Sequence, residues 1–325
     1  MALGLLLLAA FFAVLQQCRA GFSTGESLAA LQDNARHALS VLVPDIEHAG
    51  FYGFAGSAAR LTRGGTVLAE GAQLQQPDAA YPAAAVAGLP AGAHDCGTNF
   101  AVDLGLAVQG SNNVYAAGPA ATNCTPTASA GGARAGTDTL TLRHASLAPA
   151  RPLAGRLQLY TRRLESQAVT DLFADGRAPG PGDSNAEVRD LEVHMYYVAN
   201  DSVERRQWPA LRVKALTESR GAAQFRDEEV LPGVEDLQVE LGIRDPGAAD
   251  APLCFVAPDF PALRERIVYA VRLWLRIRAD RAEPGYFDSR PLRYAGVEFV
   301  PDERESRQRR VLIQRTVALR NVRQP

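Results

Sequence analysis

The N-terminal end of the chain joins an apolar segment to a segment with helical periodicity. Residues 1–15 form an uncharged, apolar run. In residues 28–46 apolar side chains recur at helical spacing with polar residues between them, which predicts an amphipathic helix with one buried face. The predicted packing face consists of Leu28, Leu31, Ala35, Leu42 and Ile46.

The apolar run is short for a membrane-spanning helix. As a helix at ~1.5 Å per residue, residues 2–15 would extend about 21 Å, against roughly 30 Å of hydrocarbon. A secretory signal peptide would need a basic start and a small-residue cleavage site, and neither Met1-Ala2 nor residues 18–20 provide them. Two interpretations therefore stay open: a signal peptide, and an anchor whose beginning lies upstream of Met1.

Local signals divide this region further. Residues 23–26 resemble a capping box, so the helix is expected to restart there after a bend at Gly21 or Gly25. Pro44 is expected to kink the last turns, and residues 48–50 form a plausible stop. An ordinary surface helix behind a discarded signal fits these residues almost as well.

Beyond Gly50 the chain is predicted to be rich in strands. Residues 53–137 are dominated by Ala, Gly and Pro and are expected to be largely loop. Alternation of apolar and polar residues then predicts strands at 139–144, 157–160, 191–197, 212–216, 237–243 and 271–277. The last strand is expected to direct Arg272, Trp274, Arg276 and Arg278 outward.

Strands without intervening helices imply an antiparallel sheet, and the N-terminal helix is the natural cover for one face of it. The predicted fold class is therefore α+β, with a long N-terminal helix packed on an antiparallel sheet with long irregular loops. The expected domains are an apolar arm (residues 1–20), an amphipathic helix (21–50) and a β-rich head (51–325).

Composition excludes some functions. With 325 residues and 47% apolar residues the chain can bury a sizeable core, and a formal charge of -2 argues against nucleic acid as a partner. Arginines are frequent in the C-terminal part, but Lys214 is the only lysine, so arginine is the general cation of this chain.

Two of the four cysteines form the best candidate pair. Cys96 and Cys124 share one loop-rich region, where a disulfide would contribute roughly 3 kcal/mol in an oxidising compartment. Cys254 follows apolar residues and is expected to be buried. No spacing typical of a zinc site occurs, so no metal is predicted.

The sequence offers no catalytic motif. It contains no GxSxG, no P-loop and no GxGxxG before a helix. Asp45 and His48 lie one helical turn apart, but a solvated helix end explains this spacing better than an acid/base pair. We therefore expect no enzyme, no cofactor and no small-molecule substrate.

Several short strings, in their order along the chain, resemble the PilW-like minor pilins of type IV pili. They are residues 31–36 (LQDNAR), 45–53 (DIEHAGFYG), 137–142 (TDTLTL), 196–200 (YYVAN), 233–242 (GVEDLQVELG) and 316–321 (TVALRN). The resemblance covers most of the chain from Leu3 onward and is weakest in residues 53–136.

This resemblance implies a pilin-like, non-enzymatic subunit that resides in the bacterial inner membrane with its head in the periplasm, and later in the extracellular pilus. It would join other minor pilins and the major pilin to prime assembly, near the fibre tip, in the service of adhesion and twitching motility. The arm that would contact lipid and then the fibre core is formed by Leu5, Leu6, Leu7, Leu8, Phe11, Phe12, Val14 and Leu15.

The chain departs from the family pattern at its start. Family members begin with a basic leader and a processing site before the apolar run, and neither precedes Met1, so an upstream start is expected. Residues 244–250 are too poor in acidic ligands for the calcium loop of some relatives. A J-like pseudopilin of type II secretion and a secreted β-protein with a signal peptide remain alternatives.

Overall fold

A computed structural model describes residues 2–54, 60–63, 66–69, 96, 100–116, 124–163, 168–180, 184–244 and 252–321. In chain order the elements are α1 (Ala2–His48), β1 (Arg60–Arg63), β2 (Thr66–Ala69), β3 (Val108–Ser111), η4 (Ala128–Ala130), β4 (Thr139–Ala145), β5 (Ala154–Arg163), β6 (Ala168–Asp175), β7 (Ala186–Ala199), β8 (Ala210–Ser219), β9 (Ala222–Pro232), β10 (Val234–Ile243), β11 (Cys254–Val256), η5 (Pro261–Glu265), β12 (Val268–Arg278), β13 (Leu292–Tyr294), β14 (Val297–Phe299), η6 (Glu305–Arg307) and β15 (Arg310–Ala318).

Strands dominate the architecture. They contain 43% of the described residues and helix only 19%, so the predicted α+β fold, a long helix packed on an antiparallel sheet, is wrong. The physical reason is that strand periodicity continues almost to the end of the chain, and the strands bury one another. One core cluster, built around Leu157, Leu191 and Met195, contains no residue of α1 at all. The sheets, and not the helix, supply most of the core.

The strands form two large sheets and a small hairpin. The larger sheet has nine strands in the order β2-β1-β6-β5-β7-β4-β3, with β8 paired to β7 and β9 paired to β8. The smaller sheet has the order β11-β10-β12-β15, and β13 pairs with β14. The β1–β6 pair is parallel, against the expectation of a wholly antiparallel arrangement. Strand β7 is central because its 14 residues pair with β5, β4 and β8.

The single described α-helix, α1, runs without a break through Gly21, Gly25 and Pro44. The expected helix restart at residues 23–26 is therefore wrong, and Thr24 instead donates a hydrogen bond to Glu283 Oε2 at 3.3 Å. The transmembrane helix expected from the sequence is not supported: among the described residues, no helix is both long enough and apolar enough to cross a membrane.

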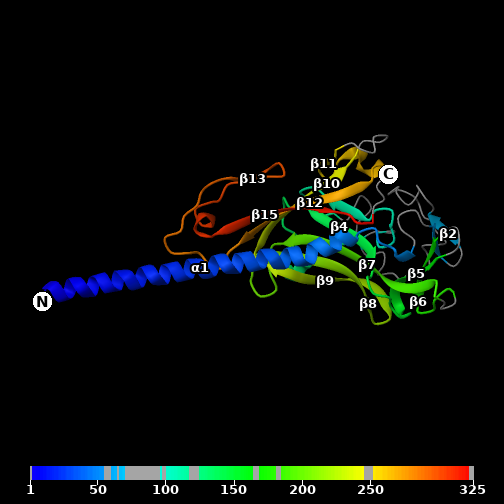
Figure 1. Ribbon diagram of the computed structural model, residues 1–325, viewed down its shortest axis with the longest axis horizontal. Helices are drawn as coiled ribbons and strands as arrows, with labels where there is room; N and C mark the ends of the chain where they lie inside the picture. Colours follow the sequence, from blue (N-terminus) through cyan, green and yellow to red (C-terminus); the bar gives the residue numbers. More distant parts are fainter. Residues whose placement is uncertain are drawn as a thin grey trace.

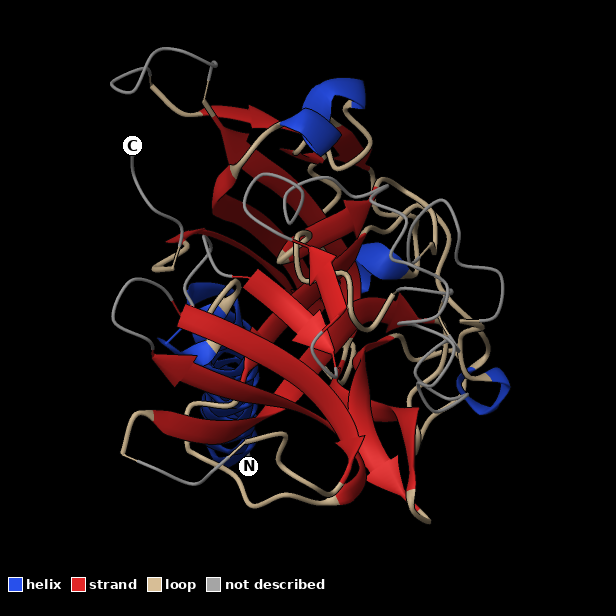
Figure 2. Ribbon diagram, turned by 90° about the vertical axis from the view of Figure 1, so that its right-hand side faces the viewer, coloured by secondary structure: helices blue, strands red, loops and turns tan. Residues whose placement is uncertain are grey.

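One end of α1 is buried between the two large sheets, and the other end projects from the head (Figure 1). The buried part contributes Leu31, Leu42 and Ile46 to a core that also takes side chains from β4, β7, β10, β12 and β15. In the view along the long axis, α1 is seen end-on among the strands (Figure 2). The helix thus contacts both sheets over its C-terminal part.

Glycines allow the sharp exit from α1. Gly50 and Gly53 have φ angles of 80° and 75°, in the left-handed region that favours glycine. The Gly50 amide donates to the Arg143 carbonyl of β4 at 3.0 Å. A Cβ at Gly53 would also clash with the side chain of Thr161 in β5. The chain can therefore turn from the helix directly onto the larger sheet.

A buried ion-pair network holds the smaller sheet together. Glu235 of β10, whose side chain is 1% exposed, accepts hydrogen bonds from Arg276 Nε at 3.1 Å and Arg310 Nε at 2.7 Å. The Arg276 guanidinium also lies 3.6 Å from the centre of the Phe299 ring of β14. Tyr294 and Phe299 of the β13–β14 hairpin contact Arg276 on this face. Trp274 and Arg276 are both buried and not exposed as their alternation predicted.

The Glu235 network predicts a pH-dependent loss of stability. Burial raises the pKa of Glu235, but the hydrogen bond and charge of Arg310, with Arg276 and Arg278, lower it below its ordinary value of 4.5. The carboxylate therefore contributes stability above pH 4.5, and this contribution is lost as the pH falls below it. We expect Glu235→Gln to cost about 3–5 kcal/mol at neutral pH.

This difference in unfolding free energy, measured by urea denaturation, should shrink as the pH falls below 4.5. Glu298→Gln is the matched control, because its ion pair with Arg293 is exposed and should contribute at most about 1 kcal/mol. A constant difference between Glu235→Gln and the wild type at all pH values would contradict the assignment.

Candidate functional site

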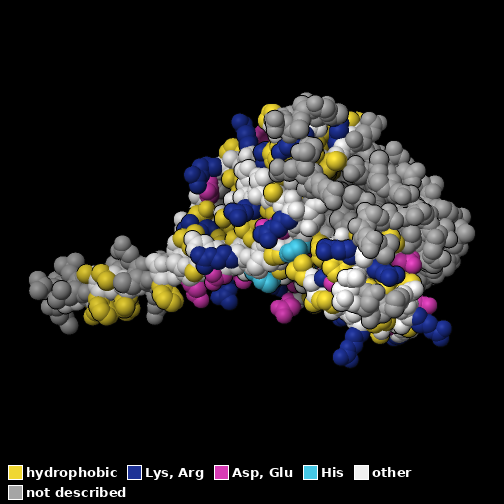
Figure 3. Space-filling view, turned by 45° about the vertical axis from the view of Figure 1, so that its right-hand side comes forward, with side chains coloured by type: hydrophobic (Ala, Val, Ile, Leu, Met, Phe, Trp, Pro, Cys, Tyr) yellow, Lys and Arg dark blue, Asp and Glu magenta, His cyan; other side chains and the backbone are white. Residues whose placement is uncertain are grey.

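The predicted apolar arm lies in the part of α1 that projects from the head. Figure 3 shows hydrophobic side chains along this projecting end. The exposed members of the predicted set are Leu8, Phe11, Phe12, Val14 and Leu15, with Phe11 61% exposed. The side chains of Leu5, Leu6 and Leu7 lie outside the described ones. An exposed series of large apolar side chains on one helix is typical of a surface that binds another apolar surface.

The predicted packing face is placed at the other end of α1. Leu31, Leu42 and Ile46 are buried, and Ala35 is half-buried against the same core. Leu28 is 42% exposed, so its expected place in the packing face is wrong. The reason is that the core formed with the two sheets begins one helical turn later, at Leu31.

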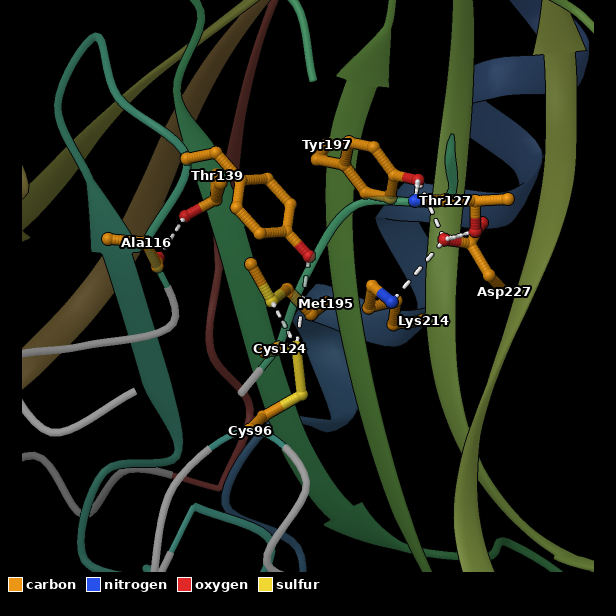
Figure 4. Close-up of a disulfide and its surroundings, with 10 residues drawn as sticks. Cys96, Ala116, Cys124, Thr127, Thr139, Met195, Tyr197, Lys214 and Asp227 are labelled. Carbon is orange, nitrogen blue, oxygen red and sulfur yellow. Dashed lines mark hydrogen bonds and ion pairs between the residues drawn. A yellow bond between two sulfur atoms is a disulfide. The ribbon is translucent and has the colours of Figure 1, made fainter. Parts of the chain in front are cut away.

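The structure joins Cys96 and Cys124 in a disulfide (Figure 4). Both cysteines are buried in the core on the face of β7 that points away from α1. Cys124 Sγ lies 3.9 Å from Met195 Sδ, and Tyr115 Oη lies 3.8 Å from Cys124 Sγ. The disulfide therefore holds the long connection before η4 against the centre of the larger sheet. Cys254, expected to be buried, is exposed.

An acidic residue in β9 fixes the chain that follows Cys124 (Figure 4). Asp227 accepts hydrogen bonds from Thr127 Oγ1 at 2.5 Å, Tyr197 Oη at 2.7 Å and Arg212 Nε at 2.7 Å. Burial raises the pKa of Asp227, but these hydrogen bonds and the Arg212 charge lower it below its ordinary value. The aspartate is therefore held ionised, as a structural group.

A second buried aspartate lies in the last turn of α1, inside the head. Asp45 Oδ1 is 2.6 Å from His144 Nε2 and 2.9 Å from His194 Nδ1, and Tyr196 Oη donates to Asp45 Oδ2 at 2.8 Å. His144 belongs to β4, and His194 and Tyr196 belong to β7. Because β4 and β7 pair side by side, the three partners lie on the one sheet face that α1 covers. We call these four residues the Asp45 cluster.

Electrostatics keep Asp45 ionised despite its burial. Burial raises the pKa of Asp45, but the charge of His194 and hydrogen bonds from both histidines reverse this effect and hold the pKa well below its ordinary value. Burial lowers the pKa of His144, yet the hydrogen bond and charge of Asp45 raise it above 6.5. A charged contact thus links the helix to the larger sheet inside the protein.

The local sequence around Asp45 and His48 predicts a solvated helix end and not this cluster. In the structure Asp45 is only 8% exposed, and His48 Nδ1 lies 2.6 Å from the Pro44 carbonyl oxygen. One signal was available. Asp45 lies three residues after Leu42 and next to Ile46, on the apolar stripe of the helix, where a carboxylate requires buried partners.

We expect Asp45→Ala to destabilise the protein by about 3–5 kcal/mol, because the variant leaves the buried His144 without its charged partner. Asp33→Ala is the control on the same helix: Asp33 is exposed and pairs only with the exposed Arg36, so its removal should change stability by less than about 0.5 kcal/mol. Urea unfolding measures both. Equal effects of the two variants would contradict a buried role for Asp45.

The disulfide gives a separate expectation. The double variant Cys96→Ser/Cys124→Ser should be less stable than the wild type by roughly 3 kcal/mol, because the unfolded chain regains loop entropy. Cys254→Ser should change stability little, since Cys254 is exposed. Peptide mapping without reductant should recover one peptide pair joined through Cys96 and Cys124. Two free thiols in protein from an oxidising compartment would refute the pairing.

Residues 195–321 match the model of the family described as PilW, type IV pilus-assembly protein W, which is not a known enzyme family. No curated protein and no solved structure matches the chain. The match begins within β7 and extends past β15, and it includes three of the resembling strings: residues 196–200, 233–242 and 316–321. Residues 195–321 are therefore PilW-like, and this match supports involvement of the protein in type IV pilus assembly.

Proposed function

We propose that this protein is a minor pilin that takes part in priming pilus assembly, near the tip of the fibre. The observation that carries the proposal is the division of α1 into two parts. Its C-terminal part is buried between the two sheets, whereas its N-terminal part presents Phe11, Phe12 and other large apolar side chains to the outside. Because the head does not cover these exposed side chains, they are available to pack against an apolar surface of another molecule.

The projecting part of α1 packs against the apolar helices of other pilus subunits, namely other minor pilins and the major pilin. Close packing of apolar helices needs no charged partner, and the same segment can contact lipid of the inner membrane before assembly. The expected apolar arm (residues 1–20), amphipathic helix (21–50) and β-rich head (51–325) correspond to these roles. The match of residues 195–321 to a type IV pilus-assembly family favours this proposal over a pseudopilin of type II secretion.

The rigid attachment of α1 supports the same role. The Asp45 cluster and the exit turn at Gly50 fix the helix to the larger sheet. The Thr24 hydrogen bond to Glu283 holds it to the connection between β12 and β13. A pull on the projecting helix is therefore transmitted to the head through several independent contacts.

The proposal is tested by genetic complementation. Deletion of the gene should abolish or strongly reduce surface pili, and the wild-type gene should restore them. A Phe11→Asp variant should not restore them, because a charge in the apolar segment opposes burial among other helices. Gln32→Asp, an exposed position on the same helix, is the matched control and should restore piliation.

Two results would overturn the proposal. The first is normal piliation after deletion. The second is full complementation by Phe11→Asp at wild-type protein levels. N-terminal sequencing of the mature chain distinguishes the secreted alternative, since a mature start near Gly21 would remove the whole predicted arm.

A further inference from the structure

We propose that Asp45, His144 and His194 form a binding site for a divalent transition-metal ion of the zinc class. The three residues come from three elements, α1, β4 and β7, that are far apart in the sequence. One ligand atom of each, the Asp45 carboxylate oxygen and one ring nitrogen of each histidine, lies within 4.8 Å of the others. This convergence is the first observation that supports a site.

The second observation is the hydrogen bonding of His144. Its Nδ1 lies 2.9 Å from the Ala145 carbonyl oxygen, which can only accept, so Nδ1 carries the proton. In this tautomer Nε2 holds a lone pair, yet Nε2 lies 2.6 Å from the Asp45 Oδ1 atom, another acceptor. Two acceptors at this distance need a cation between them. A proton meets this need here, and a metal ion that displaces it requires the two atoms to move apart to about 3 Å, since each ligand atom lies about 2.0–2.2 Å from a Zn²⁺ ion.

The third observation is the charge around Asp45. Among the ion pairs of the described residues, its partners are His144 and His194, and no arginine or lysine takes part. Glu192 lies 3.7 Å from His144 Nδ1 and adds a second negative charge close by. Two carboxylates with two histidines provide an environment in which a divalent cation is stabilised.

The ligand set selects the class of ion. Two imidazole nitrogens with one carboxylate oxygen suit Zn²⁺, Ni²⁺, Cu²⁺ or Co²⁺, whereas Ca²⁺ and Mg²⁺ prefer oxygen ligands alone. Three protein ligands leave one position for water in a tetrahedral site. The side chain of His194 is 24% exposed, while those of Asp45 and His144 are 8% and 5% exposed. The ion can therefore enter from the His194 side.

Outer contacts hold the ligands in place. Tyr196 Oη donates to Asp45 Oδ2 and so leaves Oδ1 directed at the histidines. The Ala145 carbonyl fixes the ring of His144 in the tautomer that ligation requires.

The consequence is a metal link between the helix and the larger sheet. Because the site exists only in the folded chain, binding should stabilise the docking of α1. At a free Zn²⁺ concentration about 100 times the Kd, the equilibrium constant for unfolding should fall about 100-fold. The prediction of no metal rested on the absence of closely spaced ligands in the sequence. These three ligands lie far apart along the chain, so no such spacing could indicate them.

The test uses the full-length chain, without a histidine tag, in detergent and after dialysis against a chelator. Titration with Zn²⁺ by calorimetry should give one ion per chain, and Co²⁺ should produce the visible absorption of a tetrahedral site. His194→Ala should abolish the stoichiometric binding. His37→Ala, an exposed histidine on α1, is the matched control and should bind like the wild type.

A second variant keeps the test independent of folding defects. Tyr196→Phe retains all three ligands and the shape of the core but loses the bond to Asp45, and it should weaken Zn²⁺ binding about 10–100-fold. Circular dichroism checks the fold of each variant. The inference is overturned if the wild type binds no stoichiometric Zn²⁺, or if folded His194→Ala binds it as tightly as His37→Ala.

Discussion

The structure depends on the burial of one end of a long helix between two β-sheets. Leu42 and Ile46 are completely buried there, in the same core as Leu140 of β4 and Leu273 of β12. The two sheets also contact each other directly, β10 with β4, β7 and β8. The helix end completes the core that the two sheets share.

This constraint explains why a charge lies inside the core. An apolar stripe alone would allow α1 to rotate or slide between the sheets, whereas Asp45 can be buried only where His144, His194 and Tyr196 meet it. A buried charge with fixed partners adds little net stability, but it restricts the positions that the helix can take. The cluster thus determines how the helix is seated, and hence the direction in which its exposed apolar part projects.

The central strand β7 connects the parts of the molecule. One of its faces carries His194 and Tyr196 toward the helix, and its other face carries Met195 against the Cys96–Cys124 disulfide. Both faces are therefore covered there: Tyr196 is buried, and the side chain of His194 is 24% exposed. The PilW-like match begins at Met195, within this strand, and includes the whole smaller sheet.

The sequence by itself determined the local features: the apolar stripe at Leu31, Leu42 and Ile46, the strand periodicity, and the PilW-like strings. These features depend on residues that are close together in the sequence. Helices and strands can therefore be predicted from the 3.6- and 2-residue periods of apolar side chains. The tertiary structure alone decided the dominance of strands, the exposure of Leu28 and the joining of Asp45 to two histidines about 100 and 150 residues away. Such contacts depend on which elements meet, and no local period encodes that choice.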